Sequence, residues 1–116
     1  MKLYKGRNSM NISGVARSYM SRHLGEEDFL IHVSKTVERQ LQEWDGAYEV
    51  IIMKLENYEW NVKLGDDYFH IELSEKVIHE LQHRDPYALD RKLWKDLQEQ
   101  GLKIVRGYGN YLDFVL

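Results

Sequence analysis

The sequence has no cysteine, and that absence excludes several kinds of chemistry. A disulfide scaffold, a thiolate zinc site and a cysteine nucleophile all require the missing thiol. The absence fits a reducing compartment, so we expect a cytoplasmic protein. There is one proline and no low-complexity run, so nothing marks a linker between modules. With 116 residues the chain can build one core, and we predict a single domain over residues 1–116.

Long apolar runs are also missing. The longest, from Val50 to Met53, is far too short to span a bilayer. The lysines near the N-terminus are not followed by the apolar stretch of a secretory signal. We therefore expect no membrane partner.

Charge is unevenly distributed along the chain, although the formal net charge is only −3. Residues 1–25 carry basic side chains and no acidic one, whereas residues 26–83 are strongly acidic. We interpret residues 1–25 as a basic N-terminal arm or short helix, and residues 26–116 as a compact α+β body. Within the first part, a short helix over residues 14–24 would have Ser13 as its N-cap, with four side chains near one face: Val15, Tyr19, Met20 and His23.

Hydrophobic periodicity predicts the first half of the body. Apolar residues at helical spacing predict a helix over residues 26–44. The period then changes to two, which predicts strands over residues 47–55, 58–64 and 68–73 in a three-stranded antiparallel meander. Because residues 47–55 are apolar on both faces except at Glu49 and Lys54, we expect this strand to be central.

Caps and breakers divide the second half. Ser74 can cap a helix that runs to about Arg84, and the Asp85-Pro86 pair then predicts a new helix to Gln100. Residues 102–106 and 111–116 are expected to form a C-terminal β-hairpin around the turn at residues 107–110, docked in a sheet. The predicted class is α+β, with an N-terminal helical segment, the meander, two helices and this hairpin.

One short motif carries specific chemistry. His79, Glu80 and His83 form the pattern H-E-x-x-H, in which two histidines one helical turn apart can both bind zinc. The segment resembles the active-site helix of zincin metallopeptidases, over about ten residues. The resemblance implies zinc as cofactor, His79 and His83 as metal ligands, and Glu80 as the base that activates a metal-bound water.

The alternative reading of this motif is a solvated helix face. Catalytic zinc needs three protein ligands, and the position where the extended motif has its third ligand holds Leu89. Asp90 and Glu99 are the other candidates, but Asp90 is very close in sequence and Glu99 points away from the apolar stripe of its helix. The sequence therefore favours a chain without a cofactor, and a zinc-dependent hydrolase remains the alternative.

Several side chains are candidates for contact with a partner. The basic arm contributes cations that could grip phosphates or an acidic protein, and residues 107–111 contribute aromatics of the kind enriched at interfaces. Acidic side chains of the meander could mimic a polyanion, as small acidic inhibitors from phages and mobile elements do. The candidates are Lys5, Arg7, Arg17, Arg22, Glu59, Asp66, Asp67, Tyr108 and Tyr111.

These observations lead to a ranked set of hypotheses. The first is a small non-enzymatic binding or regulatory protein whose partner is another protein, in the manner of such an acidic inhibitor. The alternatives are the minimal zinc hydrolase and a nucleic-acid-binding accessory protein that acts through its N-terminal arm. A homodimer is compatible with each of them.

Overall fold

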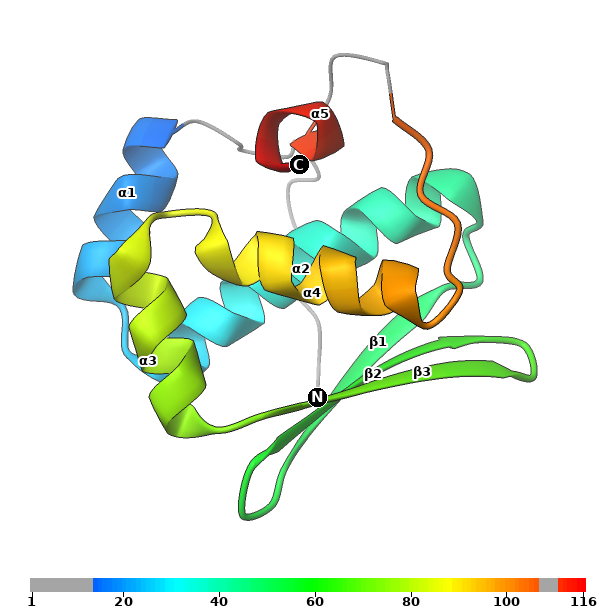
Figure 1. The fold of residues 1–116 in the computed structure, drawn as a ribbon, viewed down its shortest axis with the longest axis horizontal. Helices are drawn as coiled ribbons and strands as arrows, with labels where there is room; N and C mark the ends of the chain where they lie inside the picture. Colours follow the sequence, from blue (N-terminus) through cyan, green and yellow to red (C-terminus); the bar gives the residue numbers. More distant parts are fainter. Residues whose placement is uncertain (1–13, 107–110) are drawn as a thin grey trace.

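A computed structural model describes residues 14–106 and 111–116. It is an α+β fold in which a three-stranded antiparallel sheet carries helices on one face (Figure 1). The element order is α1 (Gly14–His23), α2 (Glu26–Trp44), β1 (Glu49–Lys54), β2 (Tyr58–Leu64), β3 (Asp67–Leu73), α3 (Glu75–Arg84), α4 (Ala88–Glu99) and α5 (Tyr111–Val115). Within the described residues, no helix has the length and apolar character needed to cross a membrane.

Helix α2 is the longest element and has the predicted bounds. Its apolar stripe is buried, with Leu30, Val33, Val37 and Leu41 each fully removed from solvent. Three acidic residues occupy its first turn, where the positive end of the helix dipole stabilises them. Burial of this stripe joins the helix to the sheet, because α2 packs against β1 and also contacts α3 and α4.

The predicted meander is confirmed, but its predicted centre is wrong. The strand order is β1-β2-β3, so β2 is central and β1 is an edge strand within the described residues. Tyr58, Trp60 and Val62 of β2 face the helices and are buried. In β1 two of the outward positions, Ile51 and Met53, are also apolar, and Met53 is 48% exposed. Apolar side chains on both faces therefore did not indicate a central strand.

Side-chain hydrogen bonds satisfy part of each sheet edge. The Val50 backbone N–H, which points away from β2, donates to Glu38 Oε2 at 2.8 Å. On the other edge, Gln100 Nε2 donates to the His70 carbonyl at 2.8 Å and Gln100 Oε1 accepts from the His70 N–H at 3.1 Å. Such contacts protect edge strands against pairing with another chain.

The predicted C-terminal hairpin is wrong. Residues 102–106 form no strand, and Tyr111–Val115 forms the short helix α5. Tyr111, Leu112 and Val115 are buried, and their spacing places them on one side of a helix rather than of a strand. The chain therefore ends in a helix that packs over α4, and the predicted turn at residues 107–110 lies outside the described residues.

Helix α1 forms where a helix was predicted, and a polar side of it is buried. Val15 is 82% exposed and Tyr19 is 61% exposed, whereas Arg17 and Ser21 are buried. This polar side is buried because Arg17 forms an ion pair with Asp90 of α4. The predicted N-cap, Ser13, lies outside the described residues.

The two helices predicted after the sheet are present as α3 and α4, but α4 begins later than predicted. The Ser74 hydroxyl caps α3 by accepting from the Val77 N–H at 3.1 Å. Helix α4 begins at Ala88 rather than at Pro86, because Asp85 accepts from the Tyr87 N–H at 2.7 Å and extends the turn. Its predicted apolar stripe is fully buried: Leu89, Leu93, Trp94 and Leu97.

Candidate functional site

The histidines of the H-E-x-x-H motif lie on an exposed side of α3. Their ring centroids are 4.4 Å apart, and the His79 side chain is 57% exposed. Glu80 is exposed as well. The contact that sequence did not predict comes from α2, where Glu26 Oε2 lies 3.0 Å from His79 Nδ1.

The residues considered as a third zinc ligand lie elsewhere. Asp90 is fully buried in an ion pair with Arg17, and Glu99 is exposed at the end of α4. Among residues 14–106 and 111–116, no three histidine or acidic side chains are grouped so as to hold a metal ion. Zinc hydrolysis through His79, Glu80 and His83 therefore stays a prediction for which the structure provides no third ligand.

The acidic candidates of the meander do not form one patch. Glu59 lies near the β1–β2 turn, whereas Asp66 lies in the β2–β3 turn and Asp67 begins β3, at the other end of the strands. Leu64, the partner of Asp67, is five residues further along β2 than Glu59, which corresponds to ~17 Å of strand. Glu59 is also only 18% exposed and contacts His70 Nε2 at 2.9 Å. The arrangement does not concentrate acidic charge as a polyanion mimic requires.

The other partner-binding candidates divide between the surface and the interior. Arg22 is exposed and donates to the Ser18 hydroxyl at 2.7 Å. Arg17 and Tyr111 are each 1% exposed and therefore do not lie on the surface. Lys5, Arg7 and Tyr108 lie outside the described residues.

Arg17 and Tyr111 instead share one carboxylate in the interior. Arg17 donates to Asp90 Oδ1, and the Tyr111 hydroxyl donates to Asp90 Oδ2. Trp94 Nε1 in turn donates to the Tyr111 oxygen at 3.2 Å. Burial raises the pKa of Asp90, and the nearby guanidinium and hydroxyl counter this only in part. Burial and the neighbouring carboxylate raise the pKa of Tyr111 well above its usual range. This network connects three helices and has no access to a substrate.

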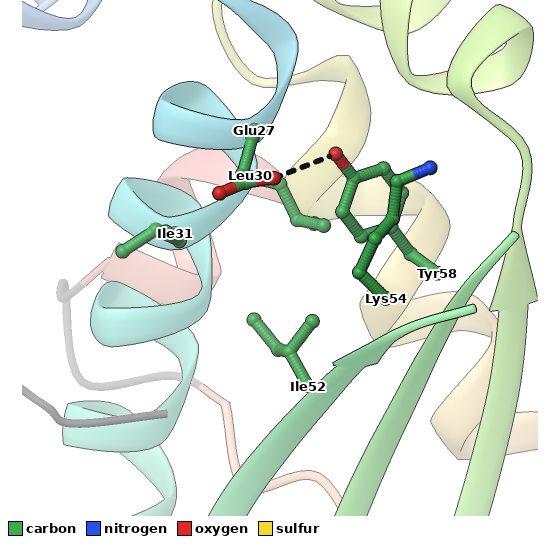
Figure 2. Close-up of a pocket in the computed structure, with 6 residues that line it drawn as sticks. All are labelled: Glu27, Leu30, Ile31, Ile52, Lys54 and Tyr58. Carbon is green, nitrogen blue, oxygen red and sulfur yellow. Dashed lines mark hydrogen bonds between the residues drawn. The ribbon is translucent and has the colours of Figure 1, made fainter.

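A mostly apolar cleft lies between α2 and the sheet (Figure 2). It encloses about 120 Å³ and is lined by Glu27, Leu30, Ile31, Ile52, Lys54 and Tyr58. The polar groups at its rim already contact one another: the Tyr58 hydroxyl donates to Glu27 at 3.1 Å, and Lys54 lies 4.6 Å from the Tyr58 ring centroid. Burial, together with Glu27, raises the pKa of Tyr58 to about 12, so the phenol stays protonated. The cleft is small, and its polar groups are engaged within the chain.

A second hollow, between α3 and α4, has a different chemistry. It encloses about 230 Å³ and is lined by Leu81, Arg84, Ala88, Arg91, Lys92 and Lys95. Leu81 and Ala88 form its apolar floor, and the four remaining side chains are all cationic. We call this surface the cationic groove. The turn at residues 85–87 creates it, because it brings the end of α3 beside the start of α4 (Figure 1).

The cations of the groove differ in how far they are neutralised. Arg91 forms an ion pair with Asp85, and Lys92 pairs with Asp96 at 2.8 Å. Arg84 and Lys95 are exposed and form no ion pair with any residue that the structure describes. The groove thus combines two partly neutralised cations with two that remain open to an external anion.

Sequence reasoning missed this groove as a site. Helix α4 carries three cations at helical spacing: Arg91, Lys92 and Lys95. Acidic residues interrupt this series, and such a pattern is typical of a solvated face of mixed charge. The available signal was the Asp85-Pro86 pair, which predicts a tight connection between two helices. Which side of the helix pair would be hollow depended on packing. Comparison with protein-family models, with curated proteins and with solved structures finds no match to this chain.

Proposed function

We propose that this chain is a binding protein whose macromolecular partner is anionic, and that the partner is a nucleic acid held by its phosphates along the cationic groove. The observation that carries the proposal is the set of four cations around one hollow, of which Arg84 and Lys95 have no ion-pair partner among the described residues. The predicted macromolecular partner is retained, but the proposed contact surface lies on α3 and α4 instead of on the basic arm.

The spacing of these cations supports a polyanion rather than a single ion. Residues three or four apart on a helix lie about 5–6 Å from one another, so Lys95 is a neighbour of both Arg91 and Lys92, and the three form one cationic patch on α4. A nucleic acid strand presents one charge per ~3.4 Å of helix axis, so a strand that crosses this patch brings several phosphates near its cations. Such contacts position a protein on the backbone without reading sequence.

The remaining charge of the chain predicts weak and local binding. The formal net charge is −3, so long-range attraction to a polyanion is absent and the groove must act at contact distance. We expect dissociation constants in the range of ~10⁻⁴–10⁻⁶ M at physiological salt, as for other sequence-independent contacts. An acidic protein could use the same cations, and the test must separate the two kinds of partner.

The test is binding of the full chain to a short fluorescent duplex and to a single strand, followed by anisotropy over a series of salt concentrations. Four phosphate contacts predict a slope of log affinity against log salt of about −3.6 for a duplex. The double variant R84Q/K95Q should reduce the magnitude of that slope by about 2 and weaken binding at least tenfold. The matched control is K63Q/K103Q, which removes two exposed cations outside the groove.

Three outcomes would contradict the proposal. The first is no salt-dependent binding to either nucleic acid. The second is an equal loss of affinity in K63Q/K103Q, because binding would then follow total charge rather than the groove. The third is tighter binding to poly-glutamate than to either nucleic acid, with loss in R84Q/K95Q, which would assign the groove to an acidic protein.

A further inference from the structure

The two histidines of α3 lie on a flank of the helix that does not line the cationic groove. At 100° per residue, His79 and His83 share one flank of α3, whereas Leu81 and Arg84 face the groove on another. The two rings lie together, with centroids 4.4 Å apart, and both side chains are open to solvent. They are therefore available to an ion from outside.

The separation of the rings matches joint binding of one metal ion. Metal–nitrogen distances of ~2.0–2.1 Å place the centroids of two imidazoles on the same ion roughly 4.5–5 Å apart. The observed 4.4 Å is close to this range, and exposed rings can adjust by a small rotation.

Glu26 restrains the orientation of the His79 ring, and two isolated surface histidines lack such a restraint. Its carboxylate, from the first turn of α2, lies 3.0 Å from His79 Nδ1 and can accept the ring N–H. That hydrogen bond fixes the tautomer in which Nε2 carries the free lone pair. Carboxylate–histidine pairs of this kind orient the ligand and increase its basicity at metal sites. Glu26 and His79 are 53 residues apart, so only the packing of α2 on α3 creates the pair.

We propose that His79 and His83 form a binding site for a divalent transition-metal ion that prefers imidazole, with Glu26 as the positioning residue for His79. Imidazole ligands suit Zn²⁺, Ni²⁺ and Cu²⁺, and affinity for such ligands is highest for Cu²⁺. With two protein ligands the ion keeps open coordination positions, which water or a donor from another molecule would fill. The site differs from the zincin arrangement because Glu80 has no assigned role and no third protein ligand is invoked.

Calorimetric titration of the untagged full chain with Cu²⁺, Ni²⁺ and Zn²⁺ tests the site. We expect one principal site per chain, tightest for Cu²⁺, whose affinity falls at least tenfold in H79Q and in H83Q. In E26Q the affinity should fall ~10–100-fold, as for other residues that orient a metal ligand. The controls H23Q and H70Q remove exposed histidines elsewhere and should leave the site unchanged. The electron paramagnetic resonance spectrum of the Cu²⁺ form should show two coordinated imidazole nitrogens.

The negative outcomes are equally specific. The site is overturned if H79Q and H83Q bind Cu²⁺ as tightly as H23Q and H70Q do. Unchanged affinity in E26Q would overturn the positioning role of Glu26. Circular dichroism identifies any variant that fails to fold, and the spectrum of the unmodified chain then decides: fewer than two nitrogens overturns the site. Failure here is separable from failure of the groove, because H79Q/H83Q should retain nucleic-acid binding.

Discussion

Arg17 of α1 and Asp90 of α4 form an ion pair in which the side chains are 1% and 0% exposed. Arg17 also donates to the Pro86 carbonyl at 3.1 Å, and Asp90 accepts from the Tyr111 hydroxyl of α5. The pair therefore joins α1 to α4 and α5, which lie far from α1 in the sequence. Arg17 Nε and Nη2 have no hydrogen-bond partner within the described residues, so its donors are only partly satisfied.

Removing one charge of this pair should destabilise the fold strongly. In D90N the guanidinium of Arg17 stays buried without a counter-charge, which costs ~3–5 kcal/mol at comparable sites. Urea unfolding followed by tryptophan fluorescence would measure the loss. The double variant R17M/D90L removes both charges and should recover most of that stability, because a buried pair replaced by apolar side chains is often neutral or stabilising. Equal destabilisation in D90N and the double variant would contradict this account.

The attachment of α1 should also depend on Gln82. Its Nε2 donates to the Ser21 carbonyl at 3.0 Å and to the Leu24 carbonyl at 2.7 Å, so it satisfies two carbonyls at the end of α1. In Q82A these buried carbonyls lose their donor, at a cost of ~1–3 kcal/mol. Hydrogen exchange measured by mass spectrometry should become faster in α1 while α2 keeps its protection. Q98A, at an exposed position of α4, is the control, and equal acceleration in both variants would count against a specific role for Gln82.

Acid should weaken the fold partly through His32. Burial lowers the pKa of His32 to about 4, and the cations Arg17, Lys35 and Arg39 contribute to the shift. The unfolded chain takes up this proton near the ordinary pKa of ~6.5. The stability contributed by neutral His32 is therefore present above pH 6.5 and is lost as the pH falls toward 4.

A comparison of variants isolates this contribution. The free energy of unfolding of H32Q should fall less than that of the unmodified chain between neutral pH and pH ~5, because glutamine does not titrate. The exposed His23 supplies the control, since H23Q should follow the pH dependence of the unmodified chain. A pH dependence in H32Q identical to that of H23Q would show that His32 is not the group responsible.

Much of the local structure was predictable because it depends on short-range patterning. The stripe of α2 and the alternation of β2 follow from the periods 3.6 and 2. The histidine pair was also visible, since ligand spacing on a helix is a property of adjacent turns. Helix α5 and the burial of Arg17 and Tyr111 were not predicted, because both side chains contact Asp90 across the fold, and propensity does not report such contacts.

The sequence alone determined which segments form helices or strands in most of the chain, and it showed two histidines one turn apart on α3. Only the tertiary structure decided that α3 and α4 enclose a groove between them, that Glu26 reaches His79, and that an arginine expected to meet a partner is buried. The reason is that these relations join residues on different elements. Their distances depend on how the elements pack, which no local pattern specifies.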